Sequence, residues 1–246
     1  MAIEEKPVGG LMAIEEKPMT LVGHLEELRG RILWSVFYWA LAAFASYQMI
    51  PSVLAKCRPL LHGHKLIFTN PTEAFFAYIN ASLVGGACLA APVFLYHVLM
   101  FVLPGLEKHE RRWIYRLLPL SIFQFLLGSA FALYVVLPVT LNFFLGFATE
   151  ELQATIRIGE FVGFIATVTV MCGVIFELPI VLFFLASLGI LSSAYLARHR
   201  RIAYFLAFVV AAVVTPTPDA LTAAVVAVPI ILNYELSILM IWLFRK

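Results

Sequence analysis

Charged residues are scarce in this chain. Asp, Glu, Lys and Arg together make up 13% of its 246 residues, whereas 62% are hydrophobic. Soluble globular domains contain about 25% charged and about 45–50% apolar residues. The composition therefore excludes a water-soluble fold for most of the chain and predicts a membrane domain. The formal net charge is +2 at pH 7, and the basic residues serve mainly as topology signals, so we expect no nucleic-acid partner.

The sequence also lacks the residue clusters that catalysis, metal binding or disulfide formation would need. Cys88 and Cys172 fall inside predicted apolar helices, which leaves Cys57 without a partner across the loops. His62 and His64 are too few for a metal site without further ligands. Neither an HExxH motif nor a Gly-x-Ser-x-Gly elbow occurs. We therefore expect no metal, no cofactor and no enzymatic activity.

The N-terminus lacks the pattern of a secretory signal peptide, because it is acidic and no cleavage pattern follows. Instead, Met1-Ala-Ile-Glu-Glu-Lys-Pro7 recurs unchanged as Met12-Ala-Ile-Glu-Glu-Lys-Pro18. We interpret residues 1–18 as a duplicated, tag-like and disordered segment. Residues 19–246 are expected to form a single membrane domain.

Apolar stretches of helical length recur along the rest of the chain. Stretches of about 20 residues with almost no charge predict transmembrane helices. The sequence predicts an all-α integral membrane protein with six of them, of which the fifth and sixth are short. They cover roughly Ile32–Ile50, Ala74–Leu103, Trp113–Phe147, Phe161–Leu188, Ile202–Val214 and Ala220–Phe244.

Lys and Arg in the loops predict the orientation. After residue 18, eleven of them fall in the N-terminal approach, the alternate loops and the C-terminus, against four in the opposite loops. Basic loops stay on the cytoplasmic side of a membrane. Both termini are therefore predicted to be cytoplasmic, in agreement with an even number of spans.

Glu177 is the most informative polar residue, because every neighbour suits lipid and a carboxylate does not. An ionisable group in hydrocarbon costs about 2.5–3.5 kcal/mol on insertion scales, so it indicates a functional site by default. Thr169, Gly173 and Glu177 are spaced four residues apart and share one helix face. Pro179 disturbs the backbone hydrogen bonds of the preceding turn. This face is either a binding surface inside the membrane or a packing face that a protonated Glu177 stabilises.

Small residues form ridges on the second and third predicted helices. Ser82, Gly86 and Ala90 follow one face of the second, and Gln124 and Gly128 lie on one face of the third. Such ridges permit close helix contact in lipid, while the Gln124 amide needs a polar partner at membrane depth. We expect a concave, cupped bundle lined by polar and small groups, although the small members also suit ordinary packing.

Seven motifs, in chain order, resemble the TatC family, the core receptor subunit of the twin-arginine protein translocase. The resemblance covers about Thr20 to Trp242. The motifs are His24-Leu-Glu-Glu-Leu-Arg-Gly-Arg31, Ala91-Pro-Val-Phe-Leu-Tyr-His97, Pro104-Gly-Leu-Glu-Lys-His-Glu-Arg-Arg112, Ala130-Phe-Ala-Leu-Tyr-Val-Val-Leu-Pro138, Phe176-Glu-Leu-Pro179, Thr215-Pro-Thr-Pro-Asp219 and Ile231-Leu-Asn-Tyr-Glu-Leu236. Three positions depart from the family pattern, namely His97, Leu133 and Ala223.

The resemblance implies a multi-pass protein of the bacterial cytoplasmic (inner) membrane that exports folded proteins using the proton-motive force. Its implied partners are twin-arginine signal peptides, TatA- and TatB-type single-helix subunits, further copies of the chain and the lipid bilayer. The residues that match the family's functional positions fall into three groups. They are Glu27, Glu110, Arg29, Phe101 and Arg111 for signal-peptide binding, Glu177 within the membrane, and Pro59 and Asp219 in the outer loops. Thr169, Gly173 and Gln124 are added to Glu177 as candidate groove residues because of the helix faces they occupy, not because of the resemblance.

Two other functional classes are alternatives to this one. An ion-coupled secondary transporter could use Glu177 as its proton site, but such folds show internal repeats and broken helices that meet at the midplane. No second copy of the Phe-Glu-Leu-Pro element occurs in the sequence. An intramembrane enzyme would need a nucleophile or a metal cluster, and none is recognisable.

Overall fold

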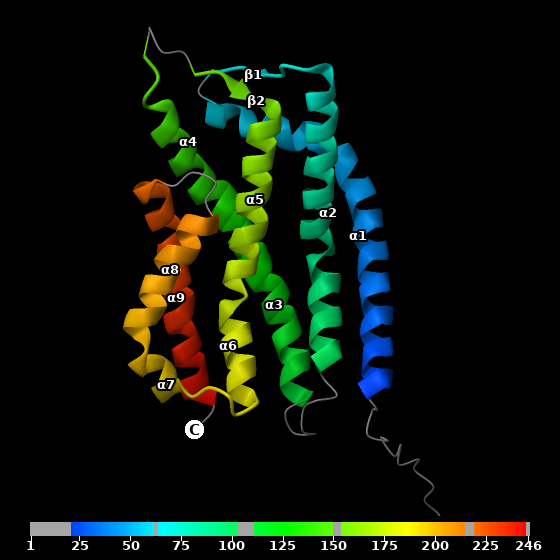
Figure 1. Ribbon diagram of the computed structural model, residues 1–246, viewed down its shortest axis with the longest axis vertical. Helices are drawn as coiled ribbons and strands as arrows, with labels where there is room; N and C mark the ends of the chain where they lie inside the picture. Colours follow the sequence, from blue (N-terminus) through cyan, green and yellow to red (C-terminus); the bar gives the residue numbers. More distant parts are fainter. Residues whose placement is uncertain (1–20, 62, 103–110, 150–153, 215–218, 245–246) are drawn as a thin grey trace, which may run out of the picture.

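The computed structural model describes residues 21–61, 63–102, 111–149, 154–214 and 219–244, and these are almost entirely helical (Figure 1). The helices are α1 (Leu21–Cys57), α2 (Pro71–Val102), α3 (Arg111–Phe131), α4 (Leu137–Leu145), α5 (Ile158–Phe176), α6 (Leu178–Ser187), α7 (Ser193–Arg198), α8 (Arg200–Val214) and α9 (Ala220–Phe244). A 3-10 turn, η1 (Arg58–Leu61), and a π-helical turn, η3 (Ala132–Val136), complete them, with two short strands, β1 (Leu66–Ile67) and β2 (Ile156–Arg157).

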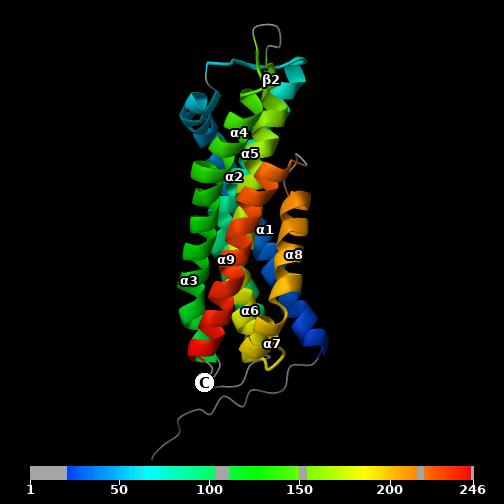
Figure 2. The same cartoon turned by 90° about the vertical axis from the view of Figure 1, so that its left-hand side faces the viewer.

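The long helices run side by side along one axis, so the bundle has two ends. The strand end carries β1, β2 and η1, and the entry end carries the first turns of α1 and α3 (Figure 1). Helix α1 packs on α2, helix α5 packs on both α2 and α3, and α9 packs on α6 and α8. Both α8 and the start of α9 stop short of the strand end (Figures 1 and 2).

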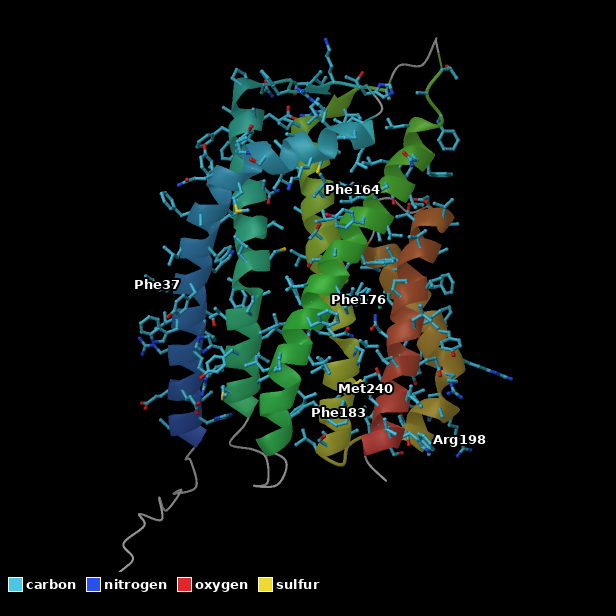
Figure 3. All side chains as sticks on the ribbon, turned by 180° about the vertical axis from the view of Figure 1, so that it is seen from behind. Phe37, Phe164, Phe176, Phe183, Arg198 and Met240 are labelled. Carbon is cyan, nitrogen blue, oxygen red and sulfur yellow. The ribbon has the colours of Figure 1, made fainter. Side chains whose placement is uncertain are left out.

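Four helical stretches are long and apolar enough to cross a membrane, and each overlaps most of one predicted span. They are Pro71–Phe101, Leu117–Leu145, Ile158–Ser187 and Ala220–Leu243. Helix α1 is 37 residues long and begins at Leu21, before the first predicted span at Ile32. Helix α8 has 15 residues and is short as predicted, whereas α9 has 25 residues, so the prediction of a short sixth helix is wrong. The aromatic side of α1 faces away from the bundle, as Phe37 does with 58% of its surface exposed (Figure 3).

Proline residues interrupt two of the predicted helices. The span over Ile158–Ser187 is two helices that meet at Glu177, with Pro179 in the first turn of α6. The span over Leu117–Leu145 contains the π-helical turn η3 immediately before Leu137 and Pro138. A proline has no N–H for the helical hydrogen bond and displaces the carbonyl four residues earlier, and π-bulges absorb such irregularities within helices.

Glycines bring the central helices into close contact. A Cβ atom added at Gly173 would lie 2.7 Å from the Phe125 ring, and one added at Gly128 would lie 2.5 Å from the Cys172 carbonyl oxygen. Gly86 meets the backbone of Ala43 in the same way, at 2.5 Å. The predicted small-residue ridges are therefore helix contacts, which hold α3 against α5 and α2 against α1.

The strand end is tied together by contacts that no sequence pattern predicted. The last turns of α1 cross the ends of α2 and α5 (Figures 1 and 3), and Cys57 and Leu61 pack with Leu141 and Phe161. Beside them, β1 and β2 pair in parallel, with Leu66 opposite Ile156.

An ion pair joins β2 to the first turn of α2. Arg157 Nη2 donates to Glu73 Oε2 over 3.2 Å, and the Thr69 N–H and hydroxyl donate to the same oxygen. The Glu73 carboxylate thereby raises the pKa of the Arg157 guanidinium. Arg157 also pairs with Glu160, so this cation helps to hold the strand end together through its two terminal nitrogens, while its Nε has no partner among the described residues.

Candidate functional site

The break between α5 and α6 lies at the centre of a buried polar cluster. Glu177 is 9% exposed, and Ser121 Oγ of α3 donates to its Oε2 over 2.6 Å. Glu177 Oε1 is also buried but has no hydrogen-bond partner among the described residues. A buried carboxyl oxygen without a partner costs free energy, so Oε1 is an unused hydrogen-bonding position inside the bundle.

Gln124 connects this break to the last helix. Its Nε2 donates to the Phe176 carbonyl over 3.3 Å and lies 3.4 Å from Asn233 Oδ1 of α9. Asn233 in turn donates through Nδ2 to the Pro229 carbonyl over 2.9 Å. The Gln124 amide thus has the polar partners that a buried amide needs inside a membrane. Its N–H group donates to a backbone carbonyl at the helix break.

Thr169 and Gly173 share the α5 face with Glu177 but have different surroundings. Gly173 is covered by Phe125 and Ser129 of α3. Thr169 borders an apolar cavity of about 200 Å³ between α1, α2, η3 and α5, and its hydroxyl has no partner within the described residues. The face is therefore closed by α3 at Gly173 and Glu177, and borders empty space at Thr169.

A second polar group lies at the entry end of the bundle. Arg31 Nε donates to Glu27 Oε1 over 2.8 Å, one helical turn along α1, and Glu27 Oε2 is buried without a described partner. Next to this pair, the His24 ring stacks on Phe101 of α2 with centroids 4.2 Å apart and planes 12° from parallel. Two of the predicted signal-peptide residues, Glu27 and Phe101, thus lie on neighbouring helix ends, and Phe101 is joined there by His24.

The remaining predicted site residues at this end are only partly described. Arg29 is exposed on α1. Arg111 begins α3, but its side chain lies outside the described residues, as does all of Glu110.

The two predicted outer-loop residues lie in different environments. Pro59 is exposed in η1 at the strand end, where it borders a groove. Asp219 precedes α9, and its Oδ1 accepts from the Thr222 N–H over 2.7 Å. Asp219 therefore caps this helix, a role in which an aspartate contributes about 0.5–2 kcal/mol.

Sequence reasoning missed four residues of these two groups. Ser121 and Asn233 complete the buried cluster, and His24 and Arg31 complete the entry group. The spacing of Glu27 and Arg31 is the familiar four-residue interval for a helical ion pair, so that contact was available from the sequence. Nothing local to Ser121 or Asn233 indicated which helix each would face.

These features define a multi-pass helical membrane protein with hydrogen-bonded polar groups buried between its helices. A family model described as "Sec-independent protein translocase protein (TatC)" matches residues 23–229. The chain therefore belongs to the TatC family.

Individual relatives agree with this assignment. The TatC protein of Desulforapulum autotrophicum is 37% identical over 96% of this chain and 88% of its own length. That of Aquifex aeolicus is 36% identical over 89% of this chain and 93% of its own length. A crystal structure titled as the twin-arginine translocase receptor TatC superposes with a TM-score of 0.78 at 34% identity, covering 91% of this chain and all of the other.

Proposed function

We propose that this protein is the signal-peptide receptor of a twin-arginine translocase in a bacterial cytoplasmic membrane. Family membership supports this function, and so does the similar solved structure, which is titled as a translocase receptor. The relatives quoted above are named as translocase proteins, which favours this function over an ion-coupled transporter. The observation that carries the proposal is the Glu27 oxygen Oε2 at the entry end, which has no hydrogen-bond partner among the described residues.

Glu27 suits an arginine of the incoming peptide. A guanidinium group donates from several N–H groups in a fixed plane and can bind carboxylates through two hydrogen bonds, which lysine reproduces poorly. Arg31 already engages Oε1, so a peptide arginine would pair with Oε2. Because Glu27 is partly buried, this pair would be screened less than an exposed one, which contributes about 0.2–1 kcal/mol.

The neighbouring groups complete a receptor surface. Glu110 is the second carboxylate that the family resemblance assigns to the peptide, and Arg29 and Arg111 are assigned with it; Glu110 and the Arg111 side chain lie outside the described residues. The stacked His24 and Phe101 rings offer an apolar platform next to Glu27. Two carboxylates together with this platform would match two consecutive arginines followed by an apolar segment.

Peptide binding to the purified chain tests this site. Glu27→Gln is expected to weaken binding of an Arg-Arg signal peptide by about tenfold or more, because a hydrogen bond to a charged group contributes about 1.5–3 kcal/mol. A Lys-Lys peptide should lose much less. Glu26→Gln is the matched control, since it removes the same charge from the exposed neighbouring position. Equal losses in the two variants, or equal losses for the two peptides, would contradict the proposal.

The proposal extends to topology and partners. We propose that both termini lie in the cytoplasm. Helices α1 and α8 then cross the membrane together with the four apolar spans, which gives six spans in a cupped bundle. TatA- and TatB-type single-helix subunits, and further copies of the chain, are the proposed partners. Glu177 Oε1 is the group we assign to a polar side chain of a partner helix, because it is buried and has no hydrogen-bond partner in the described part of the chain.

A further inference from the structure

A groove opens at the strand end between the last turns of α1, η1, the segment before β1, and α2. Its volume is about 900 Å³. Pro51 and Leu54 from α1 and Leu66 from β1 form an apolar wall, and Tyr78 contributes from α2. Neither the buried polar cluster nor the entry group borders this groove, so the proposed receptor function leaves it unexplained.

The groove is lined by two cationic side chains, Arg58 and Lys65, and no Asp or Glu is among its lining residues within the described chain. Arg58 and Lys65 are both exposed, and neither forms an ion pair with a described residue. Within the part of the chain that the structure describes, the positive charge of the groove is therefore not neutralised.

Arg58 and Lys65 differ from Arg157, which also lies at the strand end, in having no acidic partner among the described residues. Arg157 is the structural cation, engaged by Glu73 and Glu160. Only four Lys and Arg residues occur in the loops of this side, where membrane proteins carry few of them. Two of those four border one groove and have no acidic partner among the described residues, so they are available to an external anion.

The depth of the groove matches a membrane interface. Helix α2 begins at Pro71, and Tyr78 lies seven residues further along it, which is about 10 Å at 1.5 Å per residue. The polar interface on each side of a bilayer is about 5–8 Å thick. The groove thus extends from the headgroup region to the start of the hydrocarbon, and it is lined by both cationic and apolar side chains.

We propose that this groove binds an anionic glycerophospholipid, whose headgroup phosphate pairs with Arg58 and Lys65 while an acyl chain lies along Pro51 and Leu54. Guanidinium and ammonium groups form charge-assisted hydrogen bonds with phosphate oxygens. The bound lipid would link the bent end of α1 to α2. An annular, freely exchanging lipid shell would not require this charge arrangement.

Native mass spectrometry of the full chain in detergent tests the site with phosphatidylglycerol and phosphatidylcholine of identical acyl chains. We expect phosphatidylglycerol to be retained at least tenfold better. Arg58→Gln and Lys65→Gln should each lower its occupancy severalfold, and the double variant should abolish the preference over phosphatidylcholine. Lys56→Gln is the matched control, because it removes the same charge two residues away from an exposed position that does not line the groove.

Three results would overturn the proposal. One is equal retention of the two lipids by the parent chain. Another is a loss in Lys56→Gln as large as that in Arg58→Gln, which would indicate a diffuse charge effect. The third is full displacement of phosphatidylglycerol by an equimolar amount of glycerol 3-phosphate, which would identify a site for soluble phosphate esters. Because the Arg58 and Lys65 side chains are both exposed, the variants are expected to unfold at the same temperature as the parent. Thermal unfolding of the same samples measures this.

Discussion

At the residue scale, Glu177 combines two features that are rarely found together. Its Oε2 accepts from Ser121, which orients the carboxyl group, and its Oε1 is buried without a described partner. In hydrocarbon surroundings the neutral acid is the favoured form because burial penalises the charge, and a neutral acid can donate as well as accept. The residue is thus held by one helix and still able to bind another.

Substitution of Glu177 separates binding from packing. Glu177→Gln keeps one donor and one acceptor, so we expect it to assemble with a TatA- or TatB-type helix almost as the parent does. Glu177→Ala removes both, and we expect weaker association by about 0.6–2 kcal/mol, the range found for hydrogen bonds between membrane helices. Disulfide crosslinking between single cysteines in α6 and in the partner helix measures the association. Equal crosslinking of the Ala and Gln variants would reduce Glu177 to a packing element.

At the element scale, the contact between α3 and α5 depends on two glycines that approach each other's helix. Gly173 faces the Phe125 ring, and Gly128 faces the α5 backbone at Cys172. This close approach places Ser121 and Gln124 within hydrogen-bonding distance of the α5–α6 break. The polar cluster therefore depends on glycine packing one and two turns away.

A methyl group at Gly128 should disturb this contact more than one elsewhere. We expect Gly128→Ala to lower stability by about 1–3 kcal/mol, the usual cost of overpacking, because its Cβ would lie 2.5 Å from a backbone oxygen that cannot rotate away. Gly163→Ala is the control on α5, since nothing lies within 4 Å of its added Cβ. Thermal unfolding in detergent compares the two variants. A Gly128→Ala midpoint at or above that of Gly163→Ala would contradict the packing argument.

At the scale of the whole molecule, the bundle is taller on one side than on the other. The side with α1, α2 and α5 carries β1 and β2. On the other side, the last turn of α8 and the first turn of α9 do not reach the level of these strands (Figures 1 and 2). Fifteen residues of α8 are about 22 Å long at 1.5 Å per residue, which is shorter than the hydrocarbon core of about 30 Å. A membrane that meets this side must become thinner or let water in.

Solvent labelling measures this thinning. Single cysteines placed along residues 205–213 of α8 should react with a membrane-impermeant maleimide several positions deeper from the strand end than cysteines along α3 and α4. Positions near Phe205 serve as the internal reference, because they lie nearest the entry end of α8. Protection along α8 as complete as that along α3 would mean that the bilayer keeps its full thickness there.

Much of the architecture could be predicted from composition and pattern. The four apolar spans of the structure each overlap a predicted span, with ends that differ by a few residues, and the small-residue ridge around Gly86 is a helix contact as expected. Pro179 indicated a disturbed turn, but the sequence did not indicate that a helix would end at Glu177. The start of α1 at Leu21 was also not predicted, because the charged side chains of residues 26–31 fall outside an apolar span.

The sequence by itself determined the membrane class, the approximate spans and the family. Hydropathy over about 20 residues is a local property and needs no knowledge of neighbouring helices. Tertiary structure alone decided which polar groups meet. Ser121 and Glu177 are 56 positions apart and Gln124 and Asn233 are 109 apart, and the cationic groove joins α1 to α2. Such contacts depend on how each helix is rotated and how closely it packs, and no local pattern encodes either.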